Sequence, residues 1–88
     1  MGAKENIIGN FIREKRTKKG ISQGDLGKRL GYGSAQFISN LERGLAPLPP
    51  KIMKDLTKYL DISEREMLSI MLKEHEVYLT KVLRGKHA

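Results

Sequence analysis

The chain of 88 residues contains no cysteine and two histidines, His75 and His87. Without thiols it has neither a disulfide framework nor a thiolate nucleophile, and two histidines alone do not complete a metal site. No nucleophile and base, and no pair of carboxylates, stand at a spacing typical of catalysis. We therefore expect no metal, no cofactor and no enzymatic activity.

Long apolar runs are also missing. None approaches the roughly 20 residues of a membrane-spanning helix, and the first residues, Met1 to Asn6, lack the apolar segment of a secretion signal. Apolar residues make up 39% of the chain and charged residues 31%, which is typical of a soluble globular protein. We expect one domain with one modest core, located in the cytoplasm and not in a membrane.

Positive charge is abundant and unevenly distributed, for a net charge of +7. Up to Leu60 there are twelve Lys and Arg against five Asp and Glu, whereas from Asp61 onward five bases balance five acids. The excess predicts either binding to a polyanion or helix surfaces that are simply solvated by basic side chains. Charge alone does not distinguish these two interpretations.

The apolar residues recur at helical spacing, and proline is confined to residues 47, 49 and 50. The pattern predicts an all-α chain with helices over residues 7–19, 22–30, 34–43, 50–60 and 64–84. The residues placed to cap or end these helices are Asn6, Gly20, Ser22, Ser34, Gly44 and Ser63.

Residues 22–44 contain two short predicted helices joined by a turn with glycines, which is the layout of a helix-turn-helix. Asp25 follows Ser22 by three residues, as in a capping box. Gly27 lies inside the first of these helices and costs about 1 kcal/mol of helix propensity relative to alanine. We expect Gly27 to lie where two backbones come close.

The whole segment resembles the Cro and phage-repressor (lambda repressor-like) family of DNA-binding proteins over about residues 8–63. The resemblance is carried by residues 12–16, 20–23, Leu26, 30–31, 38–44 and 60–63. It implies a compact five-helix fold in which residues 1–63 form the helix-turn-helix DNA-binding domain, and the third helix enters the major groove of DNA. Residues 64–88 would form a C-terminal helix continuous with that domain.

The resemblance assigns roles to residues around the two short helices. Ser22 and Gln23 match positions that hold a DNA phosphate, with helix capping alone as the alternative, and Arg43 is a phosphate contact or a solvated surface residue. Arg16 and Glu42 match a structural pair that joins the first helix to the end of the third.

Five residues of the third predicted helix and its start match positions at base edges: Ser34, Ala35, Gln36, Ser39 and Asn40. Gln and Asn suit this task because one amide both donates and accepts, as the adenine edge requires. Phe37 either fills the core or contacts a thymine methyl group. The turn around Tyr32 holds one residue more than is common in the family, which leaves the register of this helix open by one position.

The predicted C-terminal helix carries two apolar stripes, one of Met67, Met71, Tyr78 and Val82, and one of Leu68, Leu72, Leu79 and Leu83. Either both stripes pack on the first and fourth helices of the same chain, or one of them forms a homodimer contact. A symmetric dimer would place two reading helices on half-sites about 34 Å apart.

Together these features predict a sequence-specific regulator of transcription, of repressor type, that binds double-stranded DNA as a homodimer through the C-terminal helix. The alternative is a protein-interaction module, such as an antitoxin or adaptor, that uses the same fold with its C-terminal helix as the partner surface.

Overall fold

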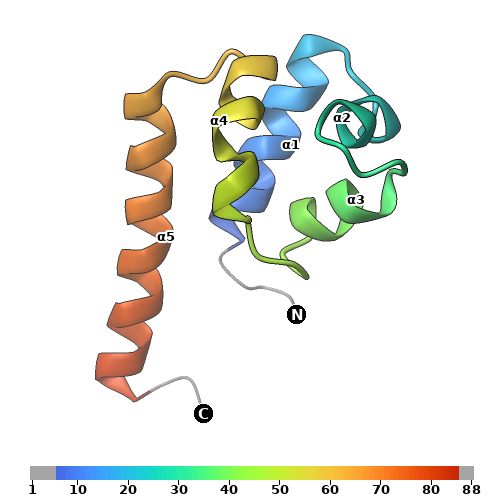
Figure 1. Cartoon of the computed structure of the whole chain (residues 1–88). Coiled ribbons are helices and arrows are strands. Elements are labelled where there is room, and N and C mark those ends of the chain that lie inside the picture. Colours follow the sequence, from blue (N-terminus) through green and yellow to red (C-terminus); the bar gives the residue numbers. More distant parts are fainter. Residues whose placement is uncertain (1–5, 86–88) are drawn as a thin grey trace.

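The computed structural model describes residues 6–85, which form five α-helices and no strand (Figure 1). The helices are α1 (Ile7–Lys19), α2 (Gln23–Arg29), α3 (Gln36–Glu42), α4 (Pro50–Tyr59) and α5 (Glu64–Arg84). The predicted all-α, five-helix architecture is therefore confirmed. The outer bounds of the two predicted segments, residues 1 and 88, lie outside the described residues, as does His87.

One hydrophobic core holds the first four helices and the start of α5 together. Its most deeply buried members come from all of the first four helices and the residue after α4: Ile12, Leu26, Ile38, Leu56 and Leu60. Met67 adds the first turn of α5 to this core, and Ile70 and Met71 pack against it. The core thus uses one side of every helix, as the helical periodicity predicts.

Most helix ends follow the local signals in the sequence. Gly20 ends α1 with a left-handed φ of 74°, and Pro50 is the first residue of α4. Ser22 Oγ accepts from Asp25 N–H at 3.0 Å, and Ser63 Oγ accepts from Glu66 N–H at the same distance. These bonds satisfy backbone donors that the helices leave free.

Two predicted caps are wrong. Asn6 precedes α1, but its side chain makes no capping hydrogen bond, and its Nδ2 instead donates to the Glu42 carbonyl at 2.7 Å. Ser34 does not cap α3, which begins at Gln36 after Ala35, and Ser34 Oγ accepts only a long 3.4 Å bond from Gln36 N–H. At Asn6 a tertiary contact is made in place of the local cap, whereas at Ser34 the helix begins later than predicted.

The longer turn between α2 and α3 is accommodated by two glycines in the left-handed region, Gly31 with φ 90° and Gly33 with φ 66°. Between them, the Tyr32 ring stacks on Phe37, with 4.1 Å between the ring centroids. Gly27 faces this turn so closely that a Cβ there would overlap the Ser34 carbonyl oxygen. The predicted close approach at Gly27 is confirmed.

Helix α5 leaves the body of the molecule along its second half, as Figure 1 shows. Near its middle, the Glu74 carboxylate accepts from Ile8 N–H at 2.8 Å, so a side chain from α5 caps the start of α1. At the other end of α1, Lys15 contacts Glu66 at 3.0 Å and Lys19 contacts Asp61 at 2.6 Å. Helix α1 is therefore tied to the C-terminal part of the chain at both ends.

Candidate nucleic-acid interface

Helix α3 is held by buried residues on one side and presents polar residues on the other. Ile38 and Leu41 lie in the core, being 0% and 2% exposed. Gln36, Asn40 and Arg43 follow the opposite side of the helix at spacings of four and three residues. We call these three residues the reading face. The longer turn left the orientation of α3 open in the sequence. Because Ile38 and Leu41 are buried in the core, the structure defines that orientation.

The reading face is linked by its own hydrogen bonds. Gln36 Nε2 donates to Asn40 Oδ1 at 3.0 Å, and Arg43 donates to the same oxygen at 2.9 Å. Asn40 Oδ1 is therefore occupied, whereas its amide N–H groups are donors that these two bonds do not use. The network limits the rotamers of three polar side chains before any ligand arrives.

The other residues expected at base edges lie around the start of α3. Ser34 is exposed in the turn, Ala35 is half-buried at the helix start, and Ser39 is half-buried within the helix. Phe37 is also half-buried and packs against the core beside Tyr32. Of the two interpretations of Phe37, the structure therefore shows packing at the edge of the core.

A charged network brings α1, α2 and α3 together behind the reading face. Arg16 Nε donates to Glu42 Oε2 at 2.5 Å and a second guanidinium nitrogen donates to Oε1 at 3.1 Å. Arg16 also donates to the Ile21 carbonyl at 2.9 Å. Arg16 is 9% exposed and Glu42 is 4% exposed, so water screens this pair weakly.

Gln23, at the first position of α2, joins the same network. Its Nε2 donates to Glu42 Oε1 at 2.9 Å, which turns the amide toward the domain and uses one of its two hydrogens. Ser22 is exposed, and its hydroxyl, which accepts from Asp25 N–H, keeps its own hydrogen to donate. Of the predicted phosphate contacts, Ser22 and Arg43 are thus exposed, and Gln23 is half-buried.

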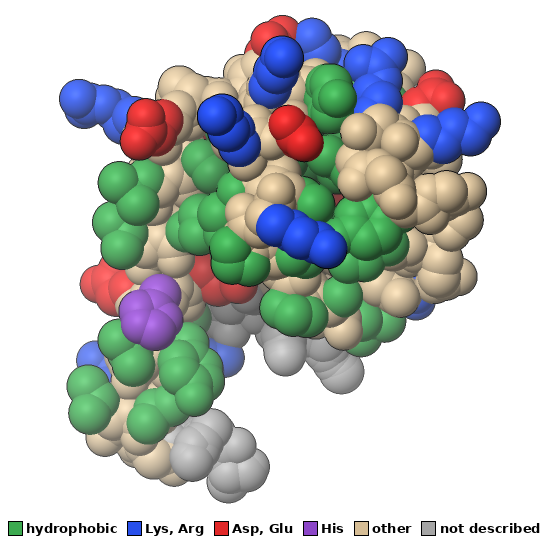
Figure 2. Space-filling model, viewed as in Figure 1, with side chains coloured by type: hydrophobic (Ala, Val, Ile, Leu, Met, Phe, Trp, Pro, Cys, Tyr) green, Lys and Arg blue, Asp and Glu red, His purple; other side chains and the backbone are tan. Residues whose placement is uncertain are grey.

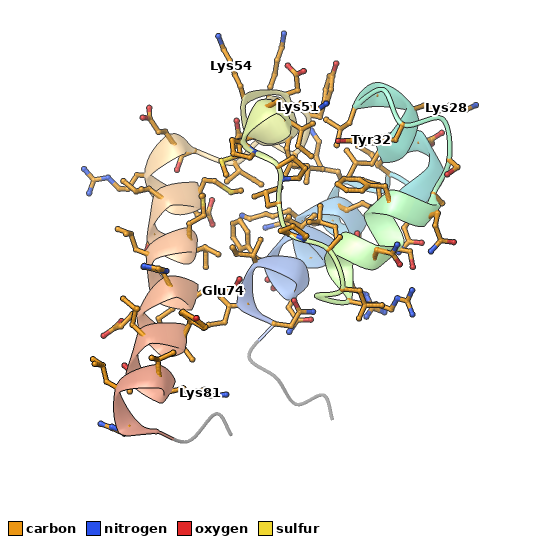
Figure 3. The ribbon with its side chains drawn as sticks, turned by 60° about the horizontal axis from the view of Figure 1, so that its bottom comes forward. Lys28, Tyr32, Lys51, Lys54, Glu74 and Lys81 are labelled. Atoms are coloured by element: carbon orange, nitrogen blue, oxygen red, sulfur yellow. The ribbon has the colours of Figure 1, made fainter. Side chains whose placement is uncertain are left out.

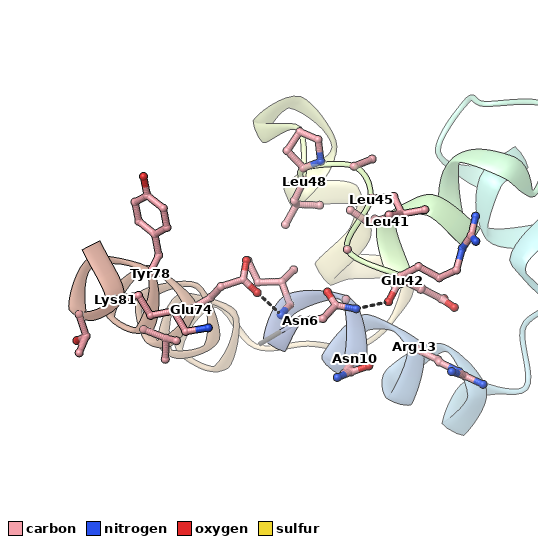
Figure 4. Close-up of a pocket in the computed structure, with 18 of the residues that line it drawn as sticks. Asn6, Asn10, Arg13, Leu41, Glu42, Leu45, Leu48, Glu74, Tyr78 and Lys81 are labelled. Carbon is pink, nitrogen blue, oxygen red and sulfur yellow. Dashed lines mark hydrogen bonds between the residues drawn. The ribbon is translucent and has the colours of Figure 1, made fainter. Parts of the chain in front are cut away.

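Asn6 has a structural role that the sequence did not indicate, since the sequence predicted only a local helix cap there. Its bond to the Glu42 carbonyl fastens the end of α3 to the start of α1, as the dashed line in Figure 4 shows. A Cβ at Gly9 would overlap both Asn6 and the Glu42 carbonyl. The glycine within α1 was the available signal, because a buried helical glycine marks a close backbone approach.

Basic side chains gather over one end of the globule, above α2 and α4 in the view of Figure 2. Lys28 on α2 and Lys54 on α4 point outward from this end, as Figure 3 shows. Arg29 lies over the Tyr59 ring, 5.7 Å from its centroid, and so contacts α4. The positive charge of the first 60 residues is therefore displayed on the body of the domain.

Two further classes of site were sought among residues 6–85. No group of acidic or histidine side chains there lies close enough to hold a metal ion. In the same part of the chain, no helix is both long and apolar enough to cross a membrane.

Comparison with known families supports the architecture. A helix-turn-helix family model matches residues 12–67, from within α1 to the first turn of α5. Comparison with curated proteins and with solved structures finds no match. The matched segment contains α2, α3, the turn between them and the charged network described above. The chain belongs to the Cro/C1-type helix-turn-helix family, whose members are DNA-binding regulators.

Proposed function

We propose that this protein is a sequence-specific transcriptional regulator that binds double-stranded DNA with α3 in the major groove. The observation that supports this most strongly is the reading face, a preorganised row of polar side chains on the second helix of a helix-turn-helix. The proposal places the protein in the cytoplasm with its DNA target and requires no cofactor.

Base reading follows from the chemistry of the reading face. With Asn40 Oδ1 occupied, Asn40 presents amide donors and Gln36 presents its amide oxygen as an acceptor. Exchange of the internal bonds for bonds to base edges would let both amides pair with adenine in the bidentate manner. Ser34, Ala35 and Ser39 would contact neighbouring bases or exclude water there.

Phosphate contacts would position the domain without reading sequence. Arg43 is exposed at the end of α3 and Ser22 is exposed before α2, so both can reach a backbone that flanks the groove. Gln23 would contribute through the amide hydrogen that Glu42 does not hold. The net charge of +7 supports association with DNA at low salt.

The proposal includes a homodimer formed through α5. Large apolar side chains on this helix are exposed, among them Leu68 at 54% and Leu72 at 59%. The interpretation in which both stripes of α5 pack within the chain is therefore wrong, because the core ends near Met71. A dimer would match two reading helices to two half-sites about 34 Å apart.

The same exposed stripe supports the alternative, in which the chain is an antitoxin or adaptor that binds another protein through α5. The two functions differ in what they require of α3. A protein-interaction module needs no sequence preference from the reading face, so selection of DNA sites separates them.

The test is selection of bound sites from random duplex DNA at a stated salt concentration. Gln36→Ala and Asn40→Ala should each relax preference at particular base pairs, by about 1 to 3 kcal/mol of discrimination. Arg43→Ala should weaken all sites alike and reduce the salt dependence.

Matched controls come from the exposed surface of α1, where Asn10 and Arg13 carry the same chemistry outside the reading face. Asn10→Ala should leave the selected motif intact. Arg13→Ala should lower affinity less than Arg43→Ala does. Recovery of no enriched motif by the wild-type protein would overturn the proposal.

A further inference from the structure

An open groove lies between the second half of α5 and the connector from α3 to α4, with the start of α1 between them (Figure 4). We call it the α1–α5 groove. Its volume is about 1410 Å³, which is larger than the roughly 300 to 1,000 Å³ of sites for small ligands. It follows α5 from Glu74 to Arg84, a length of about 15 Å along the helix axis. The groove therefore suits a segment of polypeptide better than a single small molecule.

Hydrogen bonds between distant parts of the chain fix the walls of the α1–α5 groove. Asn6 Nδ2 donates to the Glu42 carbonyl at 2.7 Å, and Ile8 N–H donates to the Glu74 carboxylate at 2.8 Å. These two bonds, dashed in Figure 4, join the start of α1 to the end of α3 and to α5. A partner would not have to order the walls, which lowers the free-energy cost of binding.

The walls expose apolar side chains from two elements. Leu45 in the connector is 66% exposed, and Tyr78 on α5 is 61% exposed. Leu48 and Val77, which are half-buried, also line the groove. Exposed apolar side chains gathered on a concave surface are typical of a site for another protein. A phosphate backbone would cover them poorly, because interfaces with nucleic acid are mainly polar.

Basic side chains from three parts of the chain also line the groove: Arg13 of α1, Arg43 after α3, and Lys81 and Arg84 of α5. All four are exposed. Within residues 6–85, neither Arg13 nor Arg84 forms an ion pair. Positive charge is therefore available on both sides of the apolar walls.

The two acids that line the groove do not cancel this charge for a ligand. Glu42 is 4% exposed and pairs with Arg16, and the Glu74 carboxylate holds the start of α1. A surface complementary to the groove would thus be acidic and would carry apolar side chains. The net charge of +7 disfavours a second copy of this chain as the occupant.

We propose that the α1–α5 groove binds a short acidic segment of a partner protein. Apolar side chains of that segment pack against Leu45 and Tyr78, and its carboxylates pair with Arg13 and Arg84. The site is distinct from the outer apolar stripe of α5, because it is built from α1, the connector and the side of α5 that faces them.

Occupation of the groove would oppose binding to DNA. Arg43 lines the groove and also donates to Asn40 Oδ1 at 2.9 Å, so it belongs to the reading face as well. A carboxylate that pairs with Arg43 competes for the side chain that the proposed function gives to a DNA phosphate. This competition rests on the proposed function, whereas binding in the groove does not.

The groove is tested with a random library of displayed peptides of about ten residues, enough to span 15 Å as a helix. Peptides are selected on the full-length protein without DNA. The enriched sequences should combine several Asp or Glu with large apolar residues. The dissociation constant of one enriched peptide is then measured by fluorescence anisotropy, and its affinity should fall as salt increases.

Variants of the groove locate the bound peptide. Leu45→Ser and Tyr78→Ser each remove an apolar contact and should weaken binding about tenfold. Arg84→Gln should weaken it by about threefold, since this contact is exposed to solvent. The matched controls are Leu79→Ser and Arg65→Gln, which replace exposed residues of α5 outside the groove and should bind the peptide as the wild type does. Every replaced residue is exposed, so circular dichroism should show the wild-type fold.

Competition is measured with a DNA site selected by the wild-type protein. Saturation with the peptide should lower the affinity for that DNA about tenfold or more, as expected when one charged contact is lost. The same peptide concentration should leave DNA binding by Tyr78→Ser nearly unchanged. This comparison separates occupation of the groove from general competition by an acidic peptide.

Failure to enrich any peptide, or enrichment of neutral or basic peptides, would overturn the proposed site. Acidic peptides that bind the groove variants and the controls equally well would place the contact elsewhere and also overturn it. Peptide binding that leaves DNA affinity unchanged would overturn the competition at Arg43. A protein that binds the peptide in the groove but selects no DNA motif contradicts the proposed function and leaves the groove supported.

Discussion

The body of the domain and the second half of α5 are both helical, but the body buries its apolar side chains and the second half of α5 leaves them exposed. In the body, every helix buries one side, and the exposed sides carry an excess of positive charge. In the second half of α5, charge is balanced and the apolar side chains stay exposed, with Leu83 at 84%. A monomer gains little from that exposed apolar surface. The difference supports the proposal that the body contacts nucleic acid and that α5 serves association.

The difference between the two regions is tested most strongly by replacing one leucine in each region with alanine. Leu56 is fully buried, so Leu56→Ala should lower the free energy of unfolding by about 2 to 5 kcal/mol. Leu72 is 59% exposed, so Leu72→Ala should change the stability of the monomer by less than about 0.5 kcal/mol. Urea unfolding at low protein concentration measures both, and equal losses would contradict the division between the two regions.

The next largest effect should come from the charged network behind the reading face. Glu42→Gln keeps the shape of the side chain but leaves Arg16 buried without its carboxylate, at a cost of about 3 kcal/mol. Glu14→Gln, on the exposed surface of α1, should have little effect. The melting temperature and the affinity for DNA should both fall in Glu42→Gln. A fully stable variant that no longer binds DNA would instead place Glu42 in the interface.

Two glycines of α2 provide a smaller contrast within the body. A Cβ at Gly27 would overlap the Ser34 carbonyl, so Gly27→Ala should destabilise the protein by about 1 to 3 kcal/mol as the turn is displaced. At Gly24 the nearest atom, Ser22 Oγ, lies 3.8 Å from such a Cβ, and Gly24→Ala should stabilise α2 by roughly 1 kcal/mol. Denaturant midpoints that shift in the same direction would disprove the close approach of α2 and the turn.

The smallest effect concerns the exposed ion pair at the start of the C-terminal part. The hydrogen bond from Lys19, and then its charge, hold the pKa of Asp61 below the usual 3.8. A lowered pKa stabilises the folded state above the unfolded value, and this contribution is lost as pH falls through the folded value. Asp61→Asn should therefore lower the melting temperature slightly at pH 7 and flatten its decline below about pH 4.

Asparagine is the suitable replacement at this position because Asp61 has a φ of 56°, which asparagine also tolerates. High salt should reduce the difference between the two proteins, since the pair is exposed to solvent. A difference that persists unchanged in acid and in high salt would show that the ion pair is not its source.

Much of the fold was predictable because its signals are local. Ser22, Ser63, Gly20 and Pro50 act within one helical turn of their own positions, so their roles can be inferred without a tertiary structure. The wrong cap at Asn6 has the opposite cause. Asn6 bonds to Glu42, which is 36 residues away, and no local pattern indicates that partner.

The candidate site also has features that the sequence indicates and features that only the tertiary structure shows. The resemblance assigned separate roles to Gln36, Asn40 and Arg43, whereas the bonds that Gln36 and Arg43 both make to Asn40 Oδ1 are known only from the structure. The stacking of Tyr32 on Phe37 across the longer turn also required the structure, because the turn could orient α3 in more than one way.

The sequence by itself determined the five helices and the helix-turn-helix, since periodicity and capping are properties of neighbouring residues. The tertiary structure decided which apolar residues α5 leaves exposed and which polar side chains point inward, such as Gln23 toward Glu42. The physical reason is that burial depends on partners that are distant in the chain, and these come together only when the core has formed.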